Sequence, residues 1–196
     1  MSINVSNLVS GPARLYVAPT GSTEPADSTV TPNGFDTPPG SPWVDVGGTD
    51  GGITVEVDSQ FNQLQVDQVP MAVGARLTDL KIAVTATLSE LTLGNLQTAL
   101  NGIGTTTQGT GYETFDLPAT YIASQPTYAA LIVDGWAPYT SSGLPALRRL
   151  IIRKVLSQAK VAFKYDRKAQ AGYECTFEAY WLSESLPLVH IVDEQT

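Results

Sequence analysis

The 196-residue sequence predicts a mainly β fold, a two-sheet β-sandwich or small barrel with one short helix. Apolar and polar residues alternate strictly through several segments, which is typical of strands with one buried and one wet face. Helical spacing is confined to residues 92–102. The apolar fraction of 42% indicates a folded globular chain, and no run approaches the ~20 apolar residues of a membrane-spanning helix.

The first part of the chain predicts a short strand followed by a long loop. Residues 14–18 have strand character, and ordered structure resumes at residues 43–46. Residues 20–42 are rich in Pro, Gly, Ser and Thr and lack periodicity. This composition predicts a loop that is longer than compact connections need.

The middle of the chain predicts a hairpin and a third strand. Residues 53–58 and 63–67 alternate in character, and a bend is predicted between them at Phe61-Asn62. A loop is expected at residues 70–75, and residues 79–89 form the third strand. The face of these strands that is predicted to be solvent-exposed carries small or acidic side chains, with one Lys and no aromatic residue.

A short helix is predicted directly after the third strand. Thr92 is the expected N-cap, and Asn101-Gly102 is the expected C-terminal stop. One face carries the leucines at positions 93, 96 and 100. Because so short a helix is not stable alone in water, we expect these leucines to pack on a sheet.

The second half of the chain predicts further strands separated by loops. Residues 104–111, rich in Gly and Thr, predict a mobile loop, and residues 138–145 predict another. The remaining strands are predicted at residues 128–136, 147–156, 160–165 and 173–182.

We expect one domain over residues 1–196, with three peripheral segments. These are an N-terminal arm (1–12), the loop 20–42 and a C-terminal arm (183–196). The C-terminal arm is too apolar for a free tail, and two alternatives remain open: it packs on a neighbouring copy or back on the sandwich.

The formal net charge of −8 is unevenly distributed along the chain. Residues 1–147 hold three bases against thirteen acids, residues 148–168 hold eight bases against one acid, and the remaining residues hold five acids and no base. An acidic body argues against nucleic-acid binding, which needs Lys and Arg to displace counterions. The basic block alternates with apolar residues as on paired strands, so a structural role is favoured over a nucleic-acid patch.

The inventory of reactive side chains argues against catalysis. The chain has one histidine, His190, and one cysteine, Cys175. This excludes the His/Cys clusters that bind zinc and leaves little for a nucleophilic triad. Cys175 cannot form an internal disulfide and is expected to be a small buried hydrophobe. We expect no enzymatic activity, no cofactor and no metal.

Two ligand-binding alternatives remain open. A carboxylate-based hydrolase could use Glu56, Asp58 and Asp67, although a solvated polar face explains these residues more simply. A carbohydrate-binding or adhesive β-sandwich could present the three tryptophans, although their apolar strand context favours packing: Trp43, Trp136 and Trp181.

Several short stretches resemble the tail tube (major tail) proteins of long, non-contractile-tailed bacteriophages. The similarity covers roughly residues 11–182. The stretches that carry it are Trp43–Thr49, Gly52–Val55, Leu64–Gln68, the strand-to-helix step Thr85–Leu96, and Cys175–Ala179.

The resemblance implies a structural virion protein that forms homohexameric rings. The rings stack into a tail tube through which the double-stranded genome passes into the host without specific binding. It further implies assembly in the host cytoplasm, partnership with tape-measure, tail-tip and tail-terminator proteins, and no membrane association. The peripheral segments are then candidates for contacts between rings. The tube of a contractile tail or of a phage-like secretion device is the alternative.

This role suits the acidic strands of the predicted hairpin. A negative wall repels DNA phosphates and keeps a passing duplex from binding. We expect the following residues to face the lumen: Glu56, Asp58, Gln63, Gln65, Asp67 and Asp79.

The charge split also suggests how copies meet. An acidic body and a basic block are complementary between neighbours, and head-to-tail contacts close into rings when the rotation permits. We expect the subunit interface to include Arg148, Arg149, Arg153 and Lys154.

Overall fold

The computed structural model describes residues 7–30, 38–119, 126–138, 146–158, 160–162, 167 and 170–194. Over these residues the chain is mainly β, with two sheets and one short helix, as the sequence predicts. The strands are β1 (Arg14–Pro19), β2 (Val44–Asp45), β3 (Thr49–Val66), β4 (Val69–Leu88), β5 (Thr105–Gly109), β6 (Tyr112–Asp116), β7 (Ala129–Ala137), β8 (Ala146–Ser157), β9 (Tyr173–Ala179) and β10 (Val189–Asp193).

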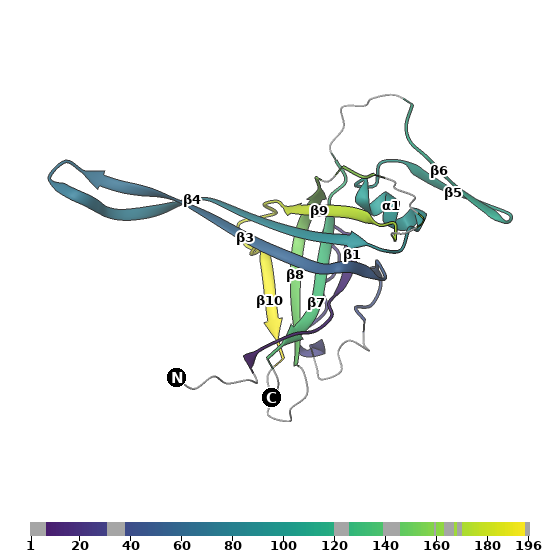
Figure 1. The fold of residues 1–196 in the computed structure, drawn as a ribbon, viewed down its shortest axis with the longest axis horizontal. Coiled ribbons are helices and arrows are strands. Elements are labelled where there is room, and N and C mark those ends of the chain that lie inside the picture. Colours follow the sequence, from purple (N-terminus) through teal and green to yellow (C-terminus); the bar gives the residue numbers. More distant parts are fainter. Residues whose placement is uncertain are drawn as a thin grey trace.

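The larger sheet bends because two different strands pair with successive parts of one edge of β8. The strand order is β2-β1-β7-β8-β9-β4-β3, and β10 also pairs with β8. The start of β8 pairs with β10 from Arg148 to Ile152, whereas its end pairs with β9 from Val155 to Ser157. Strands β9, β4 and β3 therefore cross over β7 and β8 (Figure 1). Strands β5 and β6 form a separate hairpin.

The main core lies inside this bend. Its fully buried side chains come from strands on both sides, and they include Leu15, Val84, Leu131, Ile152 and Phe177. Helix α1 (Leu93–Ala99) adds Leu96 and Ala99 to the same cluster. Burial of each such side chain contributes about 1.5–3 kcal/mol, so this cluster is the main source of stability.

Helix α1 begins and ends where the sequence predicts. Thr92 Oγ1 accepts a hydrogen bond from Asn95 N at 3.1 Å, which caps the first turn. Asn101 (φ 55°) and Gly102 (φ 70°) then adopt the left-handed conformation that ends a helix. The Asn101 amide exchanges two hydrogen bonds with the backbone of Ser157, so the end of the helix is tied to strand β8.

Part of the predicted 20–42 loop covers the outer face of β1, β7 and β8. Residues 20–30 contain only a short 3-10 turn, Asp27–Thr29. Trp43 is buried in a second apolar cluster on this outer face and donates its indole N–H to the Thr23 carbonyl at 2.9 Å. His190 Nε2 lies 3.0 Å from Asp27 Oδ1, which links the segment to β10.

The predicted bend at Phe61-Asn62 and the predicted loop at residues 70–75 are wrong. Strand β3 runs through Phe61, and residues 70–75 belong to β4, so the turn lies at Asp67-Gln68. The pairing shifts between Gln60 and Phe61, which is the mark of a β-bulge. The extra residue of this bulge is Thr78 in β4, so β3 itself continues without interruption. Its apolar positions change from Val57 and Phe61 to Leu64 and Val66, which lie on the other side of the strand, and a bend produces the same break in the sequence pattern.

The strand pairing tests two other predictions, and two more fall largely outside the described residues. Residues 104–111 form much of the β5–β6 hairpin, not a mobile loop. The apolar C-terminal arm packs back on its own domain, since β10 pairs with β8. Residues 160–162 lie outside any strand, and the rest of the strand predicted at 160–165 falls outside the described residues, as does most of the loop predicted at 138–145.

Cys175 provides a chemical test of the core. Its side chain is fully buried, and burial raises the pKa of the thiol to about 11. Since the thiolate is the reactive form, the folded protein should react with a thiol reagent at pH 8 far more slowly than protein unfolded in urea. Equal labelling rates in the two states would contradict this core.

Candidate functional site

The outer face of strands β3, β4 and β9 is acidic, and the strand register defines it. Directly paired residues project on the same side of a sheet. Glu56 pairs with Ala83, which pairs with Glu178, so these three residues form one row across the three strands. Asp50 and Glu174 both pair with Thr87 in a second row. The opposite side of the same strands faces the main core.

We call this surface the acidic face. Among its described residues it has one base, Lys81, which is exposed and lies 3.6 Å from Asp79. The row between the two acidic rows is Thr54, Thr85 and Thr176, so the centre of the face carries short side chains. Its acids are Asp50, Glu56, Asp58, Asp79, Glu174 and Glu178.

The structure brings together only part of the predicted lumen set. Glu56, Asp58 and Asp79 lie on the acidic face. Alternation along the uninterrupted β3 puts Gln63 and Gln65 on the opposite side from Glu56 and Asp58.

The remaining member of the set, Asp67, lies in the turn at the end of the hairpin. Glu174 and Glu178 were missed as members of the face. The alternation within residues 173–182 already puts them on the opposite side from the buried Cys175, but it does not say which strand lies beside them.

A hollow of about 370 Å³ lies where the hairpin leaves the body, with Glu56, Asp58, Asp79 and Glu178 in its lining. The described residues contain no group of three or more His, Cys, Asp or Glu side chains that could hold a metal ion. The carboxylates thus contribute charge to the surface and are not gathered into a metal centre.

Beyond its pairing with β9, the β3–β4 hairpin continues as a two-stranded arm. We define the arm as residues 57–82, since the last β4–β9 pair is Ala83–Glu178. It projects away from the body along the longest axis, whereas α1 and the β5–β6 hairpin lie at the other end (Figure 1). At ~3.3 Å per residue, the ten β3 residues from Val57 to Val66 extend roughly 30 Å.

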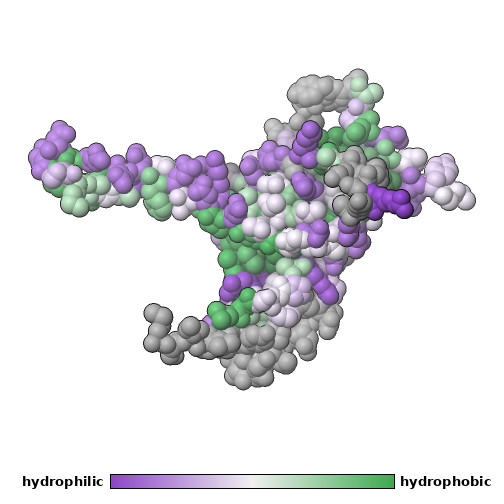
Figure 2. Space-filling view, in the orientation of Figure 1, coloured by the Kyte–Doolittle hydropathy of each residue, from purple (hydrophilic) through white to green (hydrophobic). Residues whose placement is uncertain are grey.

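The arm exposes large apolar side chains. Val57 is 65% exposed and Met71 is 75% exposed. Figure 2 shows hydrophobic residues interspersed with polar ones out to the tip. A lone two-stranded hairpin is marginally stable in water, and exposed apolar patches mark interaction sites. The other exposed members are Phe61, Leu64, Val66, Val69, Val73, Leu77 and Leu80.

Within the basic block, Arg149 forms a buried ion pair inside the chain. Its guanidinium donates two hydrogen bonds to the Asp134 carboxylate, at 2.7 and 2.6 Å, and both side chains are almost fully buried. It also donates to Thr29 Oγ1 at 3.1 Å. Direct pairing of Arg149 with Asp134 on neighbouring strands creates this geometry.

The other three predicted interface residues also have partners inside the chain. Arg148 donates two hydrogen bonds to Asp193, which lowers the pKa of that carboxyl and raises the pKa of Arg148. Arg153 binds Glu24 in the same bidentate way. Lys154 lies 4.2 Å from the centre of the Tyr128 ring. Each of the four predicted interface residues thus has a partner within one copy, and contact with another copy stays a prediction.

The three tryptophans do not lie together on one exposed strand surface. Trp43 is buried, Trp136 on β7 is half-buried, and Trp181 beyond the end of β9 is exposed. This arrangement agrees with packing in preference to a sugar-binding platform. No helix of the described residues is long and apolar enough to cross a bilayer.

A charged sheet face and a projecting hairpin with exposed apolar side chains are typical of structural proteins that assemble with further copies. A family model described as phage tail tube protein matches residues 1–196, and the chain belongs to that family. It is therefore a virion component that self-assembles into a tail tube, and not an enzyme. No curated protein sequence matches the chain.

Asp134→Ala tests the buried ion pair. It leaves the Arg149 guanidinium buried without its carboxylate, which should destabilise the unassembled protein by about 3–5 kcal/mol in urea unfolding. The matched control is Asp193→Ala, which removes a carboxylate that accepts the same pair of hydrogen bonds from the exposed Arg148. It should lower the free energy of unfolding by less than about 1 kcal/mol. Equal losses in the two variants would contradict the assigned role of burial.

Proposed function

We propose that this protein forms hexameric rings that stack into the tube of a long, non-contractile phage tail, with the acidic face lining the channel. The observation that carries the proposal is the continuity of that face across β3, β4 and β9. Its acids come from all three strands, and its centre is free of large side chains.

The electrostatics of such a wall suit the passage of DNA. Backbone phosphates and wall carboxylates repel each other, so counterion release gives the duplex no affinity for the wall. At physiological ionic strength this repulsion extends about 8 Å, the Debye length. A negative wall therefore keeps the duplex from binding at close approach without blocking a wider channel.

The arm supports stacking of copies in one direction. Apart from the buried Ile82 at its base, its large apolar side chains are exposed in the described part of the chain, and it points away from the body (Figure 1). A projecting element that docks on a different surface of the next copy makes a heterologous contact, which polymerises head to tail. Rings built this way would stack with a fixed polarity.

The tube would contact other tail proteins as well as further copies of this chain. A tube needs a length-setting component inside it and closing components at its two ends, which would be the tape-measure, tail-tip and tail-terminator proteins. We further propose that Arg148, Arg153 and Lys154 approach acids of a neighbouring copy in addition to their partners in the chain, with assembly in the host cytoplasm before genome delivery. Arg149, the fourth predicted interface residue, is buried beside Asp134 in its own copy and is not part of this contact.

Charge reversal on the acidic face should slow genome release without preventing assembly. The variant Glu56→Lys/Asp58→Lys/Glu178→Lys turns the wall attractive to phosphate, so phage carrying it should release DNA more slowly, and added salt should reduce the difference. The matched control reverses three exposed acids elsewhere: Glu113, Asp116 and Glu184. Normal tubes with unchanged release kinetics in the first variant would refute an acidic lumen.

Shortening the arm should abolish tubes while leaving the domain folded. Replacing residues 60–79 with Asn-Gly joins the paired residues Ser59 and Leu80 through a two-residue hairpin turn. Because the main core lies outside the deleted part, circular dichroism and the unfolding midpoint should change little. Negative-stain microscopy at high concentration should show tubes for the natural chain and none for the variant. Tubes of the shortened chain would contradict a role for the arm.

A further inference from the structure

Strand β2 offers an open strand edge at the end of the sheet. It pairs with β1 through Tyr16–Asp45 and Val17–Val44 and stands last in the strand order, so within the described residues its other edge carries no strand. Val44 is 65% exposed. An open edge of this kind is a template for an added strand.

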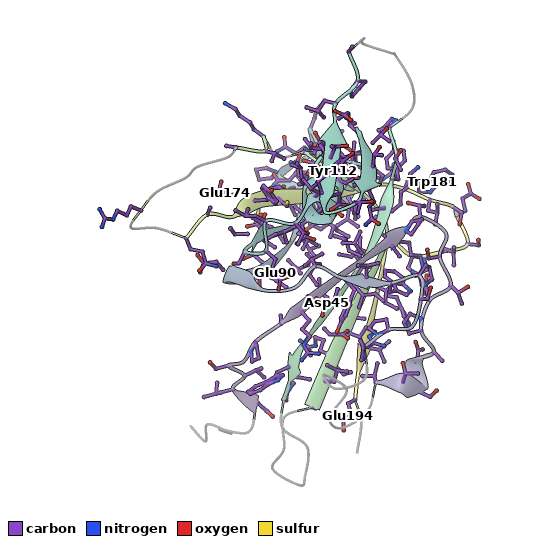
Figure 3. All side chains as sticks on the ribbon, turned by 90° about the vertical axis from the view of Figure 1, so that its right-hand side faces the viewer. Asp45, Glu90, Tyr112, Glu174, Trp181 and Glu194 are labelled. Carbon is purple, nitrogen blue, oxygen red and sulfur yellow. The ribbon has the colours of Figure 1, made fainter. Side chains whose placement is uncertain are left out.

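An apolar groove of about 250 Å³ lies beside β2. Its lining includes Val17, Pro19, Val44 and Tyr128, together with Gln97 of helix α1. The groove thus lies at the α1 end of the molecule, opposite to the arm (Figure 1). Figure 3 looks onto this end and shows the acidic residues Asp45 and Glu90 there.

A segment of the arm has the complementary pattern. In β4, residues 73–77 lie beyond the region paired with β9, so their outer edge is open among the described residues. Val73 and Leu77 are each more than half exposed, and strand alternation puts the exposed Arg76 on the opposite side from Leu77. Within the described chain Arg76 makes no ion pair.

The two patterns match when the strands lie side by side. Val44 and Asp45 are consecutive in β2, so their side chains project on opposite sides. A strand placed along β2 would bring Val73 and Leu77 toward Val44 and the groove, and Arg76 toward Asp45. The arm projects from the end of the molecule opposite to α1 (Figure 1), whereas the groove beside β2 is lined by Gln97 of α1, so the two surfaces meet between copies.

We propose that residues 73–77 in the arm of one copy add as a strand to the open edge of β2 in a second copy, with Leu77 over the groove and Arg76 beside Asp45. This inference rests on the proposed function, since it names the surface that receives the arm. Main-chain hydrogen bonds supply affinity in such an addition, and the side chains on alternate positions set its register.

Disulfide trapping tests the contact directly. A Leu77→Cys chain is mixed with a size-tagged Val44→Cys chain, assembled and oxidised. Strand neighbours fall within the Cα separation that a disulfide needs, so a mixed dimer should form. The native Cys175 is buried and gives little background. The control mixes Leu77→Cys with Thr110→Cys in the β5–β6 turn, which should give no mixed dimer.

A charge exchange tests the register. Arg76→Glu and Asp45→Lys should each raise the protein concentration needed for assembly by about tenfold, equivalent to about 1.4 kcal/mol, and the double variant should restore it. Both side chains are exposed, so the single variants should remain folded.

The outcomes separate this inference from the proposed function. If the natural chain forms tubes but no disulfide joins positions 77 and 44, or the charge exchange does not restore assembly, the inference is wrong and the proposed function still stands. Failure of the natural chain to form tubes at high concentration would overturn both. Trapping together with rescue would establish the contact.

Discussion

Strand β4 pairs with β3 along one edge and with β9 along the other, so its alternation fixes which side chains of three strands share a face. Val84 and Phe177 point into the core, whereas Ala83 stands in the row of Glu56 and Glu178 on the acidic face. A slip of one residue would bury the carboxylates and expose the apolar set, at a prohibitive cost. Core burial therefore holds the acidic face in register.

Strands β3 and β4 also form the arm, because they continue beyond the last residue pair between β4 and β9. Beyond the buried Ile82 at its base, the hairpin carries large apolar side chains that are exposed in the described chain. The domain is stable through its core, while the arm depends on a neighbour for burial. This division explains how one small domain can fold alone and still assemble in one direction.

Patterns within single strands were predictable from the sequence, and so was the helix, whose cap at Thr92 and stop at Asn101-Gly102 depend on local chemistry. The continuation of β3 through Phe61 was not, because its apolar positions change side between Phe61 and Leu64, and a bend produces the same break in alternation. The partner of Arg149 could not be foreseen either, since its pairing with Asp134 depends on the register of β7 and β8. Glu174 and Glu178 lie on the acidic face because β9 pairs with β4, which is far away in the sequence, so this position was not predictable either.

Cryo-electron microscopy of tubes assembled from the purified protein tests the central claim most directly. The account predicts a six-fold cross-section with an open channel whose wall carries Glu56, Asp58 and Glu178 on β3 and β9. A tube whose wall is built from another face of the domain, or a filament with no central channel, would contradict it.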